Sequence, residues 1–276
     1  TGTGRRTPRA AFVRRRLFSD GAWIILGDAR LIAVLCQFGS ATFHAAPPQP
    51  IRCRGRAVPA RIYRLTMSDS AAPRNPIVLI PARMASTRLP NKPLADIAGQ
   101  PMIVQVWKRA MEADIGPVVV AAGEAAIVEA VHAAGGQAVL TRSDHPSGSD
   151  RIHEALQLLD PDGRHDAVIN VQGDLPTIEP LAVKAVFAPL KDPAVDIATL
   201  AARIGERAQR DDPNIVKAVV AFAAGQRIAR ALYFSRCPAP WDGRGPDQPG
   251  DDSLPLYHHI GLYAFRRAAL SRFVAL

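Results

Sequence analysis

Residues 77–93, IVLIPARMASTRLPNKP, begin with a short apolar run that passes at once into a basic, hydroxyl-bearing loop. The apolar run is typical of a buried strand, so the loop after it should lie at the carboxyl end of that strand. Three cations and two hydroxyls occur in this loop, namely Arg83, Ser86, Thr87, Arg88 and Lys92. Arginine binds phosphate oxygens in pairs, and lysine adds a point charge. The stretch predicts a polyphosphate-binding loop; the alternative is a solvated basic turn.

From residue 77 onward, short apolar runs alternate with segments of helical period. Strands are predicted at 77–80, 118–121, 137–140 and 167–171, and helices at 101–113, 125–134, 150–159 and 179–190. Further strands are predicted at 196–203, 216–222, 228–235 and 260–265, with a long loop at 236–255. The first part is typical of a parallel sheet covered by helices on both faces. We therefore expect an α/β fold with a mostly parallel central sheet and a smaller mixed β part.

Residues 170–174, NVQGD, follow the strand predicted at 167–171. Asp174 should then lie on the same carboxyl edge of the sheet as the basic loop, and Gly173 lets the backbone approach a ligand closely. Mg²⁺ takes carboxylate, phosphate and water oxygens. The segment predicts a magnesium ligand at Asp174; the alternative is a turn in which Gly-Asp merely ends the strand.

A third polar loop, residues 141–151 (TRSDHPSGSDR), joins the strand predicted at 137–140 to the next helix. Ser149 or Asp150 is expected to cap the amino terminus of that helix. Capping does not account for the remaining polar residues, which are Arg142, His145, Ser147 and Arg151. We predict that this loop contacts the base and the triphosphate of a nucleotide, and capping alone is the alternative.

Two later segments, YFSR at 233–236 and HHIGLYAF at 258–265, carry a cation, histidines and a tyrosine. Arg236, His259 and Tyr263 would suit a hydroxylated acidic substrate. The alternative is that these are ordinary residues at strand edges. The histidine pair has no third ligand at a spacing suited to a metal site.

The charge of the chain is concentrated in its first 66 residues. The whole chain has a net charge of +9, but residues 1–66 contain 12 Arg against Asp20 and Asp28, a net of +10. Residues 67–276 carry 22 Lys and Arg against 23 Asp and Glu, a net of −1. We expect 1–66 to be a non-native or disordered extension and 67–276 to be the functional domain. A transit peptide or an RNA-binding arm is the alternative for the extension. Its apolar part is too short and interrupted for a membrane span.

Taken together, the motifs resemble the 3-deoxy-manno-octulosonate (Kdo) cytidylyltransferases. The resemblance covers about residues 77–276 and rests on PAR-x-x-STRLP-x-KPL (81–94), GQPMI (99–103), TR-x-DH-x-SG-x-DR (141–151), NVQGD-x-P (170–176), NIVK (214–217), YFSR (233–236) and HIGLY (259–263). It implies a Rossmann-like, glycosyltransferase-A-like nucleotidyltransferase fold. It also implies a reaction of CTP with Kdo that gives CMP-Kdo and pyrophosphate, for lipopolysaccharide synthesis. Sialic-acid cytidylyltransferases share the opening PAR but typically lack STRLP.

The resemblance also implies residue roles. The residues that would bind the nucleotide are Arg83, Ser86, Arg88, Lys92, Arg142, Ser147, Gly148, Arg151 and Gln172. Those that would contact the sugar are Gln172, Arg236, His259 and Tyr263. Asp174 would bind Mg²⁺ and act in catalysis with Arg83 and Lys92. A homodimer in the cytoplasm, with no nucleic-acid or membrane partner, is the expected state.

Two departures from the family pattern stand out. The family usually has an Asp after its second strand, whereas this chain reads Val120-Ala-Ala-Gly123. The family also continues beyond the position of Leu276 with a helical segment and a second metal-binding Asp. We therefore expect residues 67–276 to be an incomplete nucleotidyltransferase domain. The alternatives are a cytidylyltransferase for another sugar acid, such as sialic acid, or nucleic-acid binding through the Arg-rich segment.

Overall fold

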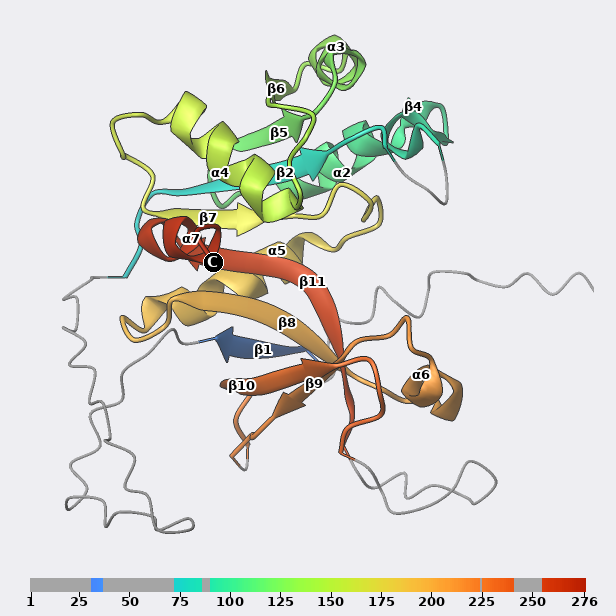
Figure 1. The fold of residues 1–276 in the computed structure, drawn as a ribbon, viewed down its shortest axis with the longest axis vertical. Helices are drawn as coiled ribbons and strands as arrows, with labels where there is room; N and C mark the ends of the chain where they lie inside the picture. The colour runs from blue at the N-terminus through green and yellow to red at the C-terminus, as the bar shows by residue number, and fades with distance from the viewer. Residues whose placement is uncertain (1–30, 37–71, 86–89, 224, 241–254) are drawn as a thin grey trace, which may run out of the picture.

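The computed structural model describes residues 31–36, 72–85, 90–223, 225–240 and 255–276 (Figure 1). Within these residues, nine strands form one sheet in the order β6-β5-β2-β7-β11-β8-β1-β10-β9. The strands of this sheet are β1 (Leu31–Cys36), β2 (Pro76–Ala82), β5 (Val118–Ala122), β6 (Gln137–Leu140), β7 (Ala167–Asn170), β8 (Ile197–Arg203), β9 (Lys217–Val220), β10 (Ile228–Ser235) and β11 (Tyr257–Arg266). A separate small ribbon pairs β3 (Asp96–Ile97) with β4 (Gln100–Pro101).

The helices lie around this sheet. They are η1 (Lys92–Leu94), α2 (Met102–Met111), α3 (Ala125–Ala133), α4 (Gly148–Leu159), α5 (Pro180–Phe187), η2 (Ala188–Lys191), α6 (Arg207–Asp211) and α7 (Arg267–Phe273). Strands β6, β5, β2 and β7 run parallel, and β11 pairs antiparallel with β7 and β8. The parallel centre with a mixed β part beside it confirms the predicted fold class.

Both faces of β2 are buried, which is why its sequence is continuously apolar. Val78 and Ile80 pack in the core formed with helices α2, α3 and α5. Ile77 and Leu79 point to the opposite face and pack in the core formed with α4 and α7. This two-residue alternation places helices on both sides of the strand. Its carboxyl end is therefore left free to begin a loop.

The predicted elements occur close to where the sequence places them, and the differences have local causes. The helix predicted at 179–190 ends at Phe187 and continues as 3₁₀ turn η2. Pro189 lacks the N–H that an α-helical bond would need, so the backbone tightens. Strand β11 begins at Tyr257, before the predicted 260, because Tyr257 pairs with Arg203 of β8.

Strand β1 and the short helix α6 were not predicted. Strand β1 lies within the first 66 residues and pairs antiparallel with β8 and parallel with β10. Its backbone ladder places Ala33 opposite Leu200, a partner far along the chain that local sequence does not reveal. The division of the chain at residues 66 and 67 stays a prediction.

None of the helices in the described part of the chain is both long enough and apolar enough to cross a bilayer.

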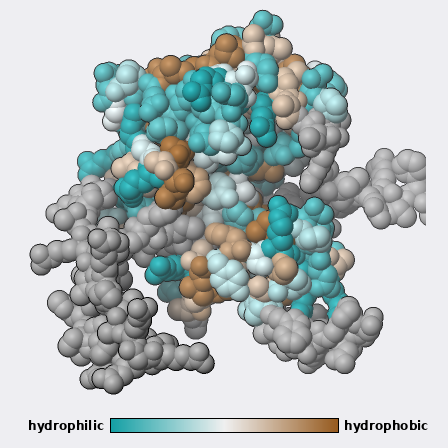
Figure 2. Space-filling model, viewed as in Figure 1, coloured by the Kyte–Doolittle hydropathy of each residue, from teal (hydrophilic) through white to brown (hydrophobic). Residues whose placement is uncertain are grey.

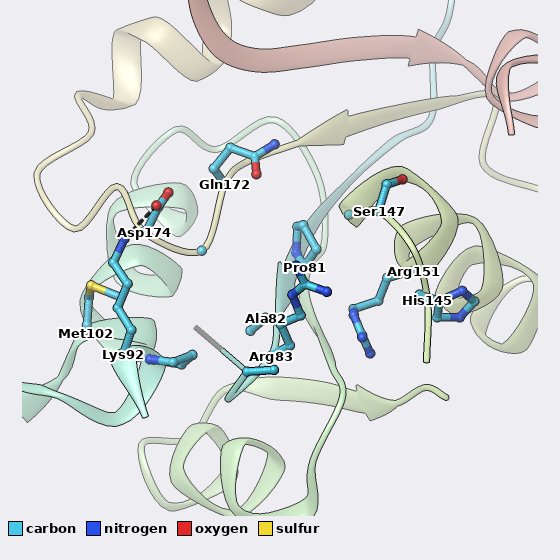
Figure 3. Close-up of a pocket in the computed structure, with 14 residues that line it drawn as sticks. Pro81, Ala82, Arg83, Lys92, Met102, His145, Ser147, Arg151, Gln172 and Asp174 are labelled. Carbon is cyan, nitrogen blue, oxygen red and sulfur yellow. Dashed lines mark hydrogen bonds and ion pairs between the residues drawn. The ribbon is translucent and has the colours of Figure 1, made fainter. Parts of the chain in front are cut away.

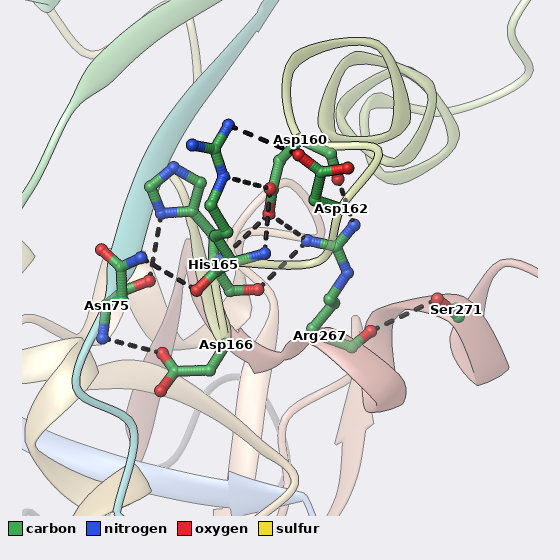
Figure 4. Close-up of polar contacts among 8 residues, drawn as sticks. Asn75, Asp160, Asp162, His165, Asp166, Arg267 and Ser271 are labelled. Carbon is green, nitrogen blue, oxygen red and sulfur yellow. Dashed lines mark hydrogen bonds and ion pairs between the residues drawn. The ribbon is translucent and has the colours of Figure 1, made fainter.

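At the amino ends of β2 and β7, a polar cluster joins four elements (Figure 4). Asp160, which ends α4 and is almost fully buried, accepts the backbone N–H groups of His165 at 2.7 Å and Arg164 at 2.9 Å. Arg267 at the start of α7 donates to the same carboxylate. Burial acts to raise the pKa of Asp160, but these hydrogen bonds outweigh it and hold the pKa well below its ordinary 3.8.

Asp160→Asn is expected to lower the free energy of unfolding at pH 7 by about 2–3 kcal/mol, because it removes a buried charge-assisted network. A depressed carboxylate pKa contributes stability above the unfolded pKa and loses it as the pH falls. The difference in the free energy of unfolding between wild type and variant should therefore have its full size at pH 7 and shrink below about pH 4. Urea unfolding at several pH values measures it. Asp162→Asn, at an exposed side chain, is the control. A difference that does not change between pH 7 and pH 3 would contradict the assigned cause.

Candidate nucleotide and sugar site

Four loops meet at the carboxyl ends of β2, β5, β6 and β7, because these strands are parallel neighbours in one sheet. Ligands of such sheets bind at this edge. A cavity of about 520 Å³ opens there. It is lined by Pro81, Ala82, Arg83, Ala85, Lys92, Pro93, Met102, His145, Ser147, Gly148, Arg151, Gln172, Gly173 and Asp174. Its size suits a nucleotide-sized ligand.

The lining is strongly basic. Arg83, Lys92 and Arg151 contribute cations, and Asp174 is the one carboxylate among the described lining residues. Figure 3 shows Lys92 and Asp174 on one side of residues 81–83, with Ser147 and Arg151 on the other. A polyanion that spans the cavity would thus meet positive charge at both ends.

Lys92 and Asp174 form an ion pair, with Lys92 Nζ 2.7 Å from Asp174 Oδ2. Both side chains are partly exposed, so the pair is accessible from the cavity. A single carboxylate next to a phosphate-binding loop fits Mg²⁺, which is usually held by one or two carboxylates together with substrate phosphates. The donor set at Asp174 is therefore compatible with a metal delivered with a triphosphate.

Gly173 allows the loop that carries Asp174 to lie directly on the end of β2. A Cβ at Gly173 would stand 2.6 Å from the carbonyl oxygen of Pro81, closer than real atoms approach. The close approach of the two backbones sets the position of both neighbours, Gln172 and Asp174. This contact is with the protein's own backbone, so the prediction that Gly173 lets the backbone approach a ligand stays a prediction.

Helix α4 starts at the cavity, two residues earlier than predicted. Its cap is Ser147, whose Oγ accepts the N–H groups of Ser149 and Asp150, so the prediction of Ser149 or Asp150 as the cap is wrong. A Cβ at Gly148 would lie 3.1 Å from Pro81 Cγ, so the glycine allows the start of the helix to pack closely on Pro81. The amino end of α4 consequently presents its positive dipole to the cavity.

Arg151 projects from the first turn of α4 and is only 2% exposed. Its Nη1 donates to Thr141 Oγ1 at 2.6 Å and to the Arg142 carbonyl at 2.8 Å. Burial lowers the pKa of Arg151, and the charge of Glu124 opposes that shift. A Cβ at Gly123 would lie 2.9 Å from Arg151 Nη1. The absence of a side chain at Gly123 thus leaves space for the guanidinium.

Two glutamates support this wall of the cavity, and the sequence analysis assigned neither. Glu154, one helical turn after Arg151, accepts the Arg142 N–H at 3.1 Å and contacts His145. Partial burial acts to raise the pKa of Glu154, but these bonds outweigh it and lower the pKa. Glu124 accepts the Met84 N–H at 2.9 Å. Helical spacing did not point to the role of Glu154, because its hydrogen-bond partners, Arg142 and His145, lie on the loop before the helix.

The predicted sugar residues Arg236, His259 and Tyr263 lie in the mixed β part and do not line the cavity. His259 and Tyr263 are on β11, with ring centroids 5.5 Å apart, and Phe234 packs on His259 at 4.5 Å. His259 also contacts Thr199 Oγ1 at 3.0 Å. Burial, then the charge of His258, lowers the pKa of His259 to about 4. The imidazole is therefore neutral at pH 7.

Gln172 lies between the cavity and strand β11 of the mixed β part. It lines the cavity, and its Cγ lies 3.8 Å from the position of a Cβ at Gly261 on β11. The predicted residues that the cavity brings together are Arg83, Lys92, Ser147, Gly148, Arg151, Gln172 and Asp174. Those that do not line it are Arg142, Arg236, His259 and Tyr263. Ser86 and Arg88 lie outside the described residues. The individual roles of all these residues stay predictions.

A basic cavity at the carboxyl edge of a parallel sheet, with Asp174 as the one carboxylate among its described lining residues, is typical of a nucleotidyltransferase. The family described as cytidylyltransferase matches residues 77–276. The chain belongs to the 3-deoxy-manno-octulosonate cytidylyltransferase family, because it shares extensive identity with several of its members. The protein of that name from Rhodospirillum centenum is 65% identical over 207 residues, which are 75% of this chain and 77% of the relative.

Two further comparisons agree with this family assignment. The 3-deoxy-manno-octulosonate cytidylyltransferase of Paramagnetospirillum magneticum is 58% identical over 201 residues, 73% of this chain and 78% of the relative. Among solved structures, CMP:2-keto-3-deoxy-manno-octonic acid synthetase complexed with CTP superposes with a TM-score of 0.64 at 38% identity. That match covers 74% of this chain and 78% of the other. The sequence resemblance and the fold class are both confirmed.

Proposed function

We propose that the protein transfers the cytidylyl group of CTP to Kdo. The observation that carries the proposal is the basic cavity at the strand ends, with Asp174 as its carboxylate and Gln172 reaching toward β11. In the reaction, the anomeric hydroxyl of Kdo attacks the α-phosphorus of CTP. A new P–O bond forms as the bond to the bridging oxygen breaks, the hydroxyl proton passes to solvent, and pyrophosphate leaves. Positioning and charge neutralisation account for most catalysis of this kind.

The residues of the cavity divide into two groups around the triphosphate. Arg83 and Lys92 neutralise phosphate charge from the loop after β2. Ser86 and Arg88, which the sequence assigns to the same loop, are proposed to share this role. Ser147, Gly148 and Arg151 seat the nucleotide from the amino end of α4, with Arg142 at the rim. Asp174 would hold Mg²⁺, which when bound would supply positive charge at the phosphate oxygens. Lys92, which is paired with Asp174 in this structure, would be available to a phosphate oxygen if Asp174 held the metal.

On the sugar side, the cation that pairs with the Kdo carboxylate is Arg236. His259 cannot serve as that cation at neutral pH, because its lowered pKa keeps it uncharged. It acts instead as a neutral hydrogen-bonding partner, together with Tyr263. Gln172 lies between the cytidine and the sugar.

We further propose a cytoplasmic homodimer that supplies lipopolysaccharide synthesis. Support for an additional interface comes from β10, where apolar side chains are exposed to solvent: Ile228, Leu232, Tyr233 and Phe234. Figure 2 shows apolar residues at the surface of the lower part of the molecule, where β9 and β10 lie. A second copy of the chain would remove this surface from water.

The test is release of pyrophosphate by the purified protein on addition of CTP, Mg²⁺ and Kdo. Release that requires all three is the expected result. Sialic acid in place of Kdo is the matched control, and turnover with sialic acid but not with Kdo would refute the substrate assignment. Light scattering on the same preparation gives the oligomeric state, and the mass of a single chain would contradict the dimer.

A further inference from the structure

Lys217, the first residue of β9, is a fully buried ammonium in the mixed β part of the fold. Its exposed fraction is 0%, and its Nζ donates to the carbonyl oxygens of Asp212 at 2.7 Å and Arg236 at 3.4 Å. Among the described residues, no carboxylate lies within ion-pair distance of it. Burial lowers the pKa of Lys217, against the raising effect of the Asp212 charge. A buried charge bonded only to carbonyls is costly, so a neutral side chain would serve simple packing better.

The strand that carries Lys217 lies between the two segments predicted to bind the sugar. Lys217 pairs with Ser235 of β10 on one side and with His258 of β11 on the other. The backbone N–H of His259 donates to the carbonyl of Val216 at 2.8 Å. The main chain of β9 thus fixes the HIGLY segment, while the Lys217 side chain reaches the YFSR segment at Arg236.

Both the backbone carbonyl and the guanidinium of Arg236 are hydrogen-bonded. Its backbone carbonyl accepts Lys217 Nζ, and its guanidinium Nη1 donates to the carbonyl of Pro213 at 3.0 Å. Pro213 directly follows Asp212, whose carbonyl is the other acceptor of Lys217. Lys217 and Arg236 therefore converge on one turn, and the position of that turn decides where the guanidinium points.

We propose that Lys217 is a positioning residue for sugar-acid binding: it anchors the backbone of Arg236 to the turn at 212–213 and so aims the guanidinium at the substrate carboxylate. The inference rests on the proposed function. Lys217 does not touch the substrate in this role. It acts through Arg236, because a cation on a long side chain binds a carboxylate well only when its direction is fixed beforehand.

The test compares Lys217→Met, which removes the donor, with Lys217→Gln, which keeps an N–H donor without the charge. KM for Kdo should rise about tenfold in Lys217→Met and less in Lys217→Gln, while KM for CTP stays within about twofold. Asn214→Ala is the matched control, because it removes a side-chain bond to Asp212 in the same turn without touching Arg236. It should leave both KM values within about twofold. Equal changes in both KM values, or none, in the Lys217 variants would overturn the proposal. If Lys217→Met does not fold, the KM values of Lys217→Gln, compared with those of wild type, decide.

Hydrogen exchange of the protein without ligand separates this inference from the proposed function. The amides of Cys237 and its neighbours should exchange faster in Lys217→Met than in wild type, and unchanged exchange would overturn the anchoring. If exchange responds as expected but wild type releases no pyrophosphate with Kdo, the proposed function fails while the anchoring of Arg236 stands.

Discussion

Asp174→Asn is expected to reduce kcat for pyrophosphate release by about 1000-fold, because the metal loses its carboxylate and the triphosphate charge is no longer balanced. The fold should be unaffected. The Lys92–Asp174 pair is partly exposed, and such pairs contribute little to stability. Steady-state kinetics over a range of Mg²⁺ concentrations, with thermal unfolding in parallel, measures both effects.

Asp144→Asn is the matched control, because Asp144 is an exposed acid on the neighbouring loop and pairs with Arg142 outside the cavity. It should retain near-normal kcat. Binding of Mn²⁺ in the presence of CTP, followed by electron paramagnetic resonance, should weaken in Asp174→Asn only. Near-normal turnover and unchanged Mn²⁺ binding in that variant would remove Asp174 from the metal site.

Gly173→Ala should lower kcat/KM by about 100-fold. The added methyl group would stand 2.6 Å from the Pro81 carbonyl oxygen, and neither backbone can yield without moving the loop. Displacement of Gln172 and Asp174 by several tenths of an ångström or more misplaces the groups around the α-phosphate, and reactions that depend on positioning are sensitive to such shifts. The loss should appear mostly in kcat.

Gly205→Ala is the control for the Gly173 substitution, since a Cβ at Gly205 meets no atom within 4 Å. It should behave as wild type. A crystal structure of Gly173→Ala would locate the displaced loop directly. Full activity with the loop unmoved would show that the close approach to Pro81 is not needed for the reaction.

The order of strands and helices was predictable from local pattern, because each element is specified by the apolar spacing within its own ten or so residues. Strands β6 and β10 occur at the predicted residues, and β2 is extended by only a residue or two at each end. The placement of three polar loops on one edge followed from parallel topology. The cap of α4 did not follow, because Ser147, Ser149 and Asp150 are all suitable caps by residue type, and only the folded backbone shows that Ser147 accepts the N–H groups.

By itself, the sequence determined the α/β class, the basic loop after the first strand of the central sheet, the carboxylate at residue 174 and the family to which they point. Only the tertiary structure decided how these groups are paired. The Lys92–Asp174 contact joins residues 82 positions apart. The contact of the buried Lys217 with the Arg236 carbonyl depends on strands β9, β10 and β11 brought together by folding. The physical reason is the range of the interactions: periodicity and turn chemistry act between near neighbours, whereas desolvation and ion pairing depend on whatever the completed fold places alongside.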